Sequence, residues 1–253
     1  MNAAHHSAGD VLAVENLGIA FGGLKAVDGV SFGAAPRAIT TVIGPNGAGK
    51  TTLFNLISGA IRPGAGRVRL EGRDVTGLSP ARLQRAGLAR SFQITNLFFD
   101  MTVRENLRLA AQVLDPPGAI FRPLSRTSRA ALKVEELVER FALGPKIHEP
   151  VKALSHGEQR RLEIAMCLAS EPRVLMLDEP TQGMSHQDTE DTARLVRGLT
   201  KEVTILLIEH DIGLVMSLSD HVVVMHQGRR LAAGTPAEVR ADPAVQAAYF
   251  GQG

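Results

Sequence analysis

The chain has 253 residues, of which 44% are hydrophobic, and its 28 Lys and Arg nearly balance its 26 Asp and Glu. This balance favours neither nucleic acid nor membrane lipid as a partner, and no apolar run approaches the ~20 residues of a membrane span. The sequence starts without a basic segment, apolar core and cleavage site, so we expect a cytoplasmic protein.

Short apolar runs alternate with helical patterns along the chain, which indicates an α/β fold. The middle runs are continuously apolar rather than alternating, which predicts strands covered on both faces in a mainly parallel sheet. Strands are expected at residues 11–21, 39–44, 174–178, 204–209 and 221–227, with antiparallel edge strands at 25–35 and 67–72.

The stretch from about residue 79 to residue 170 is mainly helical in pattern. One helix is expected to start at Ser79-Pro80, and a second at Thr102, where Glu105 completes a capping box. A further capped helix is expected at Thr235 near the C-terminus. The sequence therefore predicts an α/β core, a small N-terminal antiparallel β subdomain and a helical insertion.

The segment LSHGEQ, residues 154–159, places Ser155, His156 and Glu158 almost side by side, as in a hydrolase triad. The spacing of Ser155 and Glu158 is instead that of a capping box, in which each side chain binds a backbone N–H of the other residue. Neighbouring residues on a helix point in different directions, so Ser155 and His156 cannot readily share a proton. We therefore expect a capped helix here and no triad.

The segment GPNGAGKTT, residues 44–52, lies between an apolar strand and a helix and matches the phosphate-binding P-loop pattern. Glycines allow the backbone to approach phosphates closely, and the following helix directs its positive end at the anion. A chance glycine-rich turn is the alternative, and the order of strand, loop and helix argues against it. The residues predicted to bind nucleoside triphosphate are Gly44, Pro45, Asn46, Gly47, Ala48, Gly49, Lys50, Thr51 and Thr52.

A second acidic motif, VLMLDEP at residues 174–180, places two carboxylates at the end of an apolar strand. Open α/β sheets bind ligands at the carboxyl ends of their strands. We expect Thr51 and Asp178 to hold Mg²⁺, Lys50 to bridge the β- and γ-phosphates, and Glu179 to polarise an attacking water. The alternative is that the paired acids only cap the next element.

The order of motifs resembles the ATP-binding-cassette (ABC) ATPases. The P-loop is followed by Gln93 in RSFQ, by LSHGEQ, by VLMLDEP and by His210 in LLIEHD. The resemblance implies an ABC nucleotide-binding domain with a P-loop NTPase core over residues 11–251, a helical subdomain at about 94–170 and a flexible N-terminus at 1–10.

In this family, two cassettes close head to tail, and the signature motif of one binds the γ-phosphate held by the P-loop of the other. The resemblance therefore makes Ser155, Gly157 and Glu158 nucleotide-binding residues that act in trans. The motif usually reads LSGGQ, so His156 and Glu158 depart from the pattern and put the contacts of the last position in doubt. Ser185 stands where the family typically carries an Asp that reports across the dimer, so this crosstalk is expected to differ.

Three further roles follow from the resemblance. Phe21 in FGG matches the aromatic residue that stacks on adenine, although a strand-end core residue is the alternative. Gln93 matches the glutamine that senses Mg²⁺ and the attacking water and links the helical subdomain to the membrane partner. His210 matches the switch histidine that contacts the γ-phosphate. Taken alone, Gln93 would be an ordinary surface residue and His210 a structural one.

Longer segments, including FGGLKAVDGVSF, RSFQITNLFFDMTVREN and DPAVQAAYFG, are similar to the ATPase subunits of bacterial branched-chain amino acid importers. Relatives in this branch import other amino acids, urea, amides and aromatic acids, and RSFQ favours the LivG-type subunit over its LivF-type partner. Two alternative classes are the ATPase of lipopolysaccharide export, against which RSFQ argues, and a soluble cassette acting on ribosomes or DNA. The latter usually carries tandem cassettes or long coiled-coil insertions, and neither is visible.

This resemblance implies a peripheral protein on the cytoplasmic face of the bacterial inner membrane, with ATP and Mg²⁺ as cofactors. The expected partners are two integral-membrane permease subunits, a second ATPase subunit (LivF-type or another copy of this chain) and a periplasmic solute-binding protein. Nucleic acid is not expected as a partner.

Overall fold

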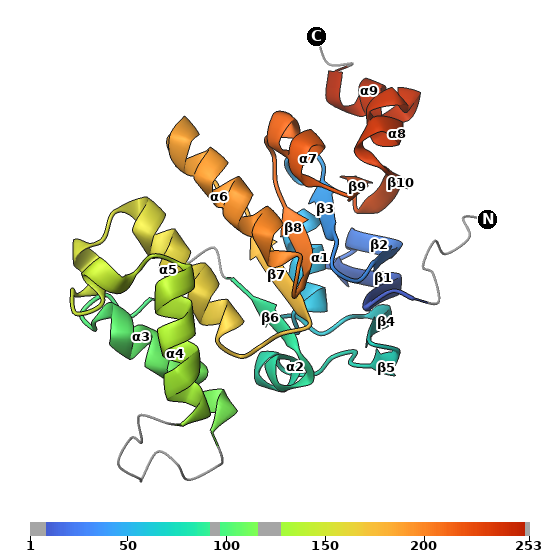
Figure 1. Ribbon diagram of the computed structural model, residues 1–253. Helices are drawn as coiled ribbons and strands as arrows, with labels where there is room; N and C mark the ends of the chain where they lie inside the picture. The colour runs from blue at the N-terminus through green and yellow to red at the C-terminus, as the bar shows by residue number, and fades with distance from the viewer. Residues whose placement is uncertain (1–8, 92–96, 116–127, 251–253) are drawn as a thin grey trace.

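The computed structural model describes residues 9–91, 97–115 and 128–250, and it has two sheets with helices on both faces of the larger one (Figure 1). The smaller sheet is antiparallel, with strand order β2-β1-β4-β5. Its strands are β1 (Leu12–Phe21), β2 (Leu24–Ala34), β4 (Ala65–Leu70) and β5 (Arg73–Asp74). The predicted N-terminal antiparallel layer is therefore confirmed.

The larger sheet has the order β10-β9-β3-β8-β7-β6 and is parallel except for the pair formed by β9 and β10. Its strands are β3 (Ile39–Ile43), β6 (Leu88–Arg90), β7 (Val174–Asp178), β8 (Thr204–Ile208), β9 (His221–His226) and β10 (Arg229–Gly234). Every residue of β3, β7 and β8 is buried, so these strands are covered on both faces as predicted.

The two faces of the larger sheet contribute to two different cores, because successive side chains of a strand point to opposite faces. Val174 and Met176 of β7 pack with α1 (Lys50–Ile57) and the antiparallel sheet. Leu175 and Leu177 pack with the helices on the other face. Those helices include α3 (Val103–Ala111), α4 (Arg129–Arg140), α5 (His156–Leu168) and α6 (His186–Leu199).

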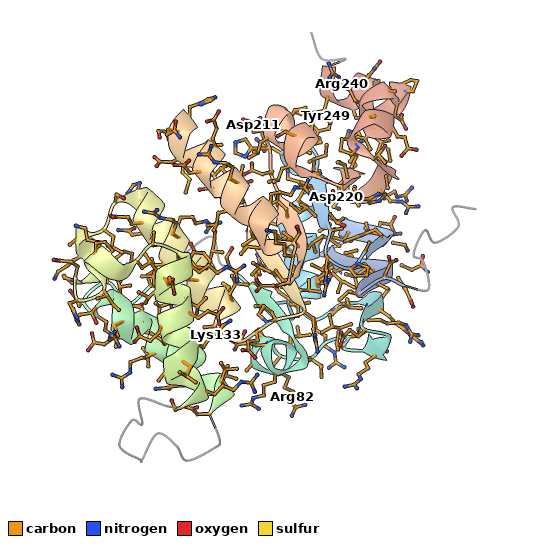
Figure 2. All side chains as sticks on the ribbon, in the orientation of Figure 1. Arg82, Lys133, Asp211, Asp220, Arg240 and Tyr249 are labelled. Carbon is orange, nitrogen blue, oxygen red and sulfur yellow. The ribbon has the colours of Figure 1, made fainter. Side chains whose placement is uncertain are left out.

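The helices α3, α4 and α5 form a group beside the β6 edge of the sheet (Figure 1). The remaining helices are α2 (Pro80–Ala86), α7 (Ile212–Leu218), α8 (Pro236–Ala241) and α9 (Pro243–Phe250), with short 3-10 turns at η1 (Gln112–Leu114), η3 (Gly144–Lys146) and η4 (Val151–Ala153). None of the helices in the described ranges has the length and apolar character needed to cross a bilayer. Charged side chains such as Arg82, Asp211 and Arg240 are exposed at the periphery (Figure 2).

The predicted helix starts agree with the structure. Thr102, Ser155 and Thr235 are N-caps with complete capping boxes. Ser79 is also an N-cap, although its side chain accepts no cap hydrogen bond and Pro80 fills the first helical position. These boxes fix where each chain segment turns into its helix, including the start of α5.

The strand predictions are wrong about one edge, and they omit β5, β6 and β10. The strand predicted at 67–72 is not an edge strand, because β5 pairs with its outer side at Arg69 and Leu70. One omitted strand, β6, lies inside the stretch whose pattern is mainly helical. Its three residues are too few for a period to be visible. It pairs in parallel with β7, and it carries Arg90 at its end.

Candidate functional site

The loop between β3 and α1 has the conformation that its glycines permit. Gly49 is the N-cap of α1 with φ 97°, and Gly47 has φ 77°. A Cβ on Gly49 would lie 2.4 Å from the carbonyl oxygen of Ala26, so only glycine fits. The loop therefore brings its backbone N–H groups to the start of a helix, where an anion is stabilised.

Lys50, the first residue of α1, is buried under this loop. Its ammonium donates to the carbonyl oxygens of Gly44 at 2.7 Å and Pro45 at 3.2 Å. Burial lowers the pKa of Lys50, and the nearby charges of Glu179 and Asp178 oppose that shift. The lysine is thus held beside the loop, with carboxylates close enough to affect its titration.

A cleft of about 600 Å³ lies over the loop and contains the predicted phosphate-binding residues. It brings Glu179, from the second motif, to the same space as the P-loop. The lining residues are Leu24, Lys25, Ala26, Asn46, Gly47, Ala48, Gly49, Lys50, Thr51, Thr52, Glu179, Gln227 and Gly228. Gly44 and Pro45 lie behind this lining and provide the two carbonyl groups that bind Lys50.

Asp178 lies at the end of β7 in a buried ion pair. Its Oδ2 accepts from Nη2 of Arg90 at 2.9 Å, and the two side chains are 1% and 6% exposed. The other oxygen, Oδ1, is buried and accepts no hydrogen bond from the described residues. A buried carboxylate oxygen of this kind fits the hard oxygen ligands that Mg²⁺ prefers, and Thr51, the second residue expected to hold the ion, lines the cleft over the P-loop.

Glu179 follows Asp178 in a left-handed backbone conformation, with φ 44°. Its Oε2 lies 3.9 Å from Nδ1 of His210, so the structure brings together these two predicted site residues. Glu209, which sequence reasoning passed over, is fully buried and accepts from the backbone N–H of His210 at 3.0 Å. The Thr181 hydroxyl also donates to Glu209, which connects the loop after β7 to the residue that precedes His210.

The start of α5 is a capping box and not a triad. The Ser155 hydroxyl accepts from the backbone N–H of Glu158 at 3.3 Å, and the backbone N–H of Ser155 donates to Oε2 of Glu158 at 2.8 Å. This last bond holds the pKa of Glu158 below its ordinary value. Ser155 is exposed, and neither it nor Gly157 lines the P-loop cleft of the same chain.

The other sequence-predicted residues have simpler positions. Phe21 ends β1 opposite Leu24 and is 50% exposed, so the alternative of a strand-end core residue is wrong. Its strand partner Leu24 lines the P-loop cleft, so Phe21 lies near the edge of that cleft. Ser185 is the N-cap of α6 and accepts from the backbone N–H of Asp188 at 3.2 Å. Gln93 lies outside the described residues.

The sequence model of a protein family described as ABC transporter matches residues 27–182, which is more than half of the chain. The chain belongs to the ABC transporter family. A second model, described as branched-chain amino acid ATP-binding cassette transporter, matches residues 229–253 of this cassette. The resemblance read from the motif order is thereby confirmed.

Relatives of known name match the cassette over nearly its whole length. It is 42% identical to the high-affinity branched-chain amino acid transport ATP-binding protein BraF of Pseudomonas aeruginosa, over 96% of this chain and 98% of that protein. It is 41% identical to LivG of Escherichia coli K12, named for the same transport, with the same coverage.

Solved structures of ABC transporter cassettes share the fold. A nucleotide-free cassette is 31% identical with a TM-score of 0.83, over 96% of this chain and 100% of that one. A cassette in its ADP conformation is 33% identical with a TM-score of 0.83, over 96% and 99%. These likenesses confirm the predicted class, an ABC ATPase fold with a mainly parallel sheet and an antiparallel layer.

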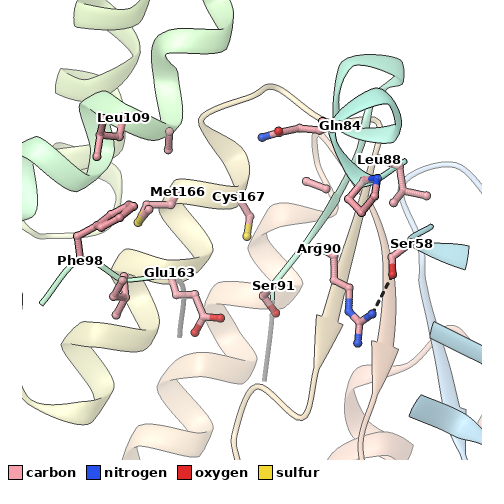
Figure 3. Close-up of a pocket in the computed structure, with 15 residues that line it drawn as sticks. Ser58, Gln84, Leu88, Arg90, Ser91, Phe98, Leu109, Glu163, Met166 and Cys167 are labelled. Carbon is pink, nitrogen blue, oxygen red and sulfur yellow. Dashed lines mark hydrogen bonds between the residues drawn. The ribbon is translucent and has the colours of Figure 1, made fainter. Parts of the chain in front are cut away.

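The cassette has a second, more apolar cavity between β6 and the helical group (Figure 3). Its volume is about 770 Å³, and Phe98, at one end of it, is 52% exposed. Arg90 extends from its other end toward Ser58, the C-cap residue of α1, to which it donates at 2.8 Å. The residues lining it are Ser58, Pro80, Ala81, Gln84, Leu88, Ala89, Arg90, Ser91, Leu97, Phe98, Leu109, Ala110, Glu163, Met166 and Cys167.

Proposed function

We propose that this cassette binds and hydrolyses ATP as one of the two ATPase subunits of a bacterial importer for branched-chain amino acids or related small polar solutes. The observation that carries the proposal is the identity to branched-chain amino acid transport ATP-binding proteins over nearly the whole chain. The match of the C-terminal segment to the branched-chain cassette model supports it independently of the shared ATPase motifs. Both favour import over lipopolysaccharide export or action on ribosomes or DNA.

ATP would be bound by the residues that line the P-loop cleft. Residues 46–52, which include the start of α1, line the space where the phosphates would lie. The Lys50 ammonium, now on two loop carbonyls, is within the same cleft and would turn to the β- and γ-phosphates. Phe21, exposed beside the cleft, would stack on the adenine.

Mg²⁺, when bound, supplies positive charge that offsets the charge developing on the phosphates. Thr51 and Asp178 would hold it, together with Gln93. The Oδ1 oxygen of Asp178 is available for this role, because Arg90 engages the other oxygen of the same carboxylate.

The chemical step is the transfer of the γ-phosphoryl group from ATP to water, with ADP as the leaving group. Glu179 would accept a proton from the water as its oxygen forms a bond to phosphorus and the bond to the ADP oxygen breaks. His210, 3.9 Å from the Glu179 carboxylate, would contact the γ-phosphate. The backbone donors of the P-loop and Lys50 would stabilise the charge on the phosphoryl oxygens.

A second cassette would complete this site. Ser155, Gly157 and Glu158 lie at the start of α5, where the positive end of the helix dipole favours an anion. Because they do not line the P-loop cleft of their own chain, the phosphate that they contact would be held by the partner ATPase. That partner would be a LivF-type subunit or a second copy of this chain.

The remaining partners would be two integral-membrane permease subunits and a periplasmic solute-binding protein. The cavity beside β6 is the surface that we assign to a permease, since it is large, apolar and bordered by the exposed Phe98. The cassette would therefore sit at the cytoplasmic face of the inner membrane. Gln93, two positions after the cavity-lining residue Ser91 in the sequence, would sense both the permease and the nucleotide.

The proposal is tested with Glu179→Gln in the assembled complex of cassette, permeases and second ATPase. The variant should bind ATP like the wild type and hydrolyse it slower by about two or more orders of magnitude, the scale of losing a general base. Hydrolysis at the wild-type rate would remove Glu179 from the chemistry and overturn the assigned mechanism.

A further inference from the structure

Arg160, on the second turn of α5, binds the backbone on both sides of Glu179. Its Nε donates to the carbonyl oxygen of Pro180 at 3.2 Å, and its Nη2 donates to that of Asp178 at 3.2 Å. Its Nη1 donates to the carboxylate of Glu163 at 2.5 Å. The guanidinium thus connects the helical group to the loop that carries the proposed general base.

The backbone at Glu179 needs such support, because it is strained. A residue other than glycine in the left-handed region costs of order 1–3 kcal/mol, and it persists only where its surroundings fix it. The N–H of Glu179 donates to Ile208 at 3.0 Å, which fixes one side of the residue. The Arg160 guanidinium fixes the two carbonyl groups that flank it, and together these bonds determine where the carboxylate points.

The geometry requires an arginine in this position. A guanidinium offers five N–H donors in a rigid planar fork, whereas a lysine offers one compact charge on a flexible chain. Here three donors of the fork reach three separate acceptors, which are two backbone carbonyl oxygens and the carboxylate of Glu163. The side chains of Arg160 and Glu163 are only 12% and 7% exposed. A lysine could replace the charge and could not make all three bonds at once.

Glu163 is an unusual partner because part of it is left unsatisfied. Its Oε1 is buried and has no hydrogen-bond partner among the described residues. Burial raises the pKa of Glu163, and the Arg160 charge opposes that shift. A buried carboxylate with one oxygen that makes no hydrogen bond lowers the stability of the fold. We therefore assign its bond to Arg160 a different role, which is to orient the guanidinium toward the loop that carries Glu179.

We propose that Arg160, oriented by Glu163, is a positioning residue that fixes the carboxylate of Glu179 and links it to the start of α5. The inference rests on the proposed function, since it gives Arg160 a role only if Glu179 acts in hydrolysis. Arg160 lies five residues beyond the N-cap Ser155, a rise of about 7.5 Å along the helix. A phosphate of the partner's nucleotide, bound at Ser155, would therefore change the position of α5. Arg160 would transmit that change to the carboxylate of Glu179.

The test uses Arg160→Met, Arg160→Lys and Glu163→Gln in the assembled complex, with kcat, the KM for ATP and the thermal midpoint measured on each preparation. Arg160→Met should lower kcat about 10- to 100-fold, the cost of misplacing a catalytic group by an ångström or so, with the KM changed less than about twofold. Arg160→Lys should recover only part of this loss. Glu163→Gln should show a smaller loss, because the amide oxygen still accepts from Arg160.

A matched control is available on α4, where Lys133 and Glu136 form an ion pair with the same spacing along the helix and a distance of 2.8 Å. Lys133 is labelled in Figure 2. Lys133→Met should leave kcat within about twofold of the wild type, because the described ion pair of Lys133 is with Glu136 of the same helix, involves no residue assigned to the site, and is half-exposed on its Glu136 side.

A double variant separates positioning from a general structural role. If Arg160 acts through Glu179, then Arg160→Met should slow Glu179→Gln no further, whereas independent effects would multiply. The inference is overturned if Arg160→Met keeps wild-type kcat, if its loss multiplies with that of Glu179→Gln, or if kcat, KM and thermal midpoint all deteriorate together. A wild-type rate in Glu179→Gln alone would instead overturn the proposed function.

Discussion

Arg90→Met tests how strongly the acid at the end of β7 depends on its buried partner. The ion pair of Arg90 with Asp178 has a 2.9 Å bond and side chains that are 6% and 1% exposed. The same guanidinium donates to Asn55 at 2.7 Å and to Ser58 at 2.8 Å. Removing one partner of a buried pair leaves the other charge uncompensated, which costs about 3–5 kcal/mol.

The assay is thermal and urea unfolding of the isolated chain without nucleotide. For a domain of this size about 1 kcal/mol shifts the midpoint by about 2–4 °C, so Arg90→Met should unfold about 6–20 °C earlier. Arg69→Met is the control, because the Arg69–Glu15 pair has the same 2.9 Å distance with side chains 35% and 23% exposed. Its cost should stay below about 1 kcal/mol.

A second substitution identifies the cause of the Arg90 effect. Arg90→Met combined with Asp178→Asn should be more stable than Arg90→Met alone, because the buried charge is gone. The reasoning is refuted if Arg90→Met unfolds within about 1 kcal/mol of the wild type, or if neutralising Asp178 recovers no stability.

Three further predictions concern the nucleotide site, the start of α5 and the partner subunits. Ser155→Arg should keep ATP affinity at its own P-loop and lose hydrolysis in the assembled complex, whereas Lys50→Ala should lose ATP binding. If Ser155 were only a cap, Ser155→Arg would instead lose about 1 kcal/mol of stability with activity preserved. The lowered pKa of Glu158 means that its charge stabilises the fold fully above the unfolded-state pKa of about 4.3, and that this contribution is lost as the pH falls through the lower folded pKa. Urea unfolding across acidic pH should show this loss in the wild type and not in Glu158→Gln. The purified chain alone should be a weak, monomeric ATPase that its permeases and second ATPase stimulate, as steady-state assays with and without them would show.

Local patterns predicted the fold where one segment determines its own structure. The apolar runs of β3, β7 and β8 are continuous because both faces are covered, so sequence alone identified them. The capping box at Ser155 depends on two residues three positions apart, and it was equally visible. The strand β6 has too few residues to show a period, and it is a strand because it pairs with β7, which lies far away in the sequence.

The missed parts of the site depend on contacts between distant segments. Arg90 reaches Asp178 across 88 positions of sequence, and Arg160 reaches the carbonyl of Pro180 across 20. Arg90 is the first residue of RSFQ, and Arg160 directly follows LSHGEQ, but both motifs predicted a function through other residues. The sequence could not show which groups these two arginine side chains bind, because a long side chain binds whichever acceptor the packing of distant segments brings within reach. Glu209 was hidden for the same reason beside His210.

The most direct test of the central claim is ATP-driven uptake of radiolabelled leucine, isoleucine or valine into vesicles that contain this cassette, its permeases, the second ATPase and the solute-binding protein. Uptake should require ATP on the side of the cassette, and it should fall about 100-fold or more with Glu179→Gln, in step with hydrolysis. Rapid ATP hydrolysis by the complex with no uptake of any of the three amino acids would contradict the claim.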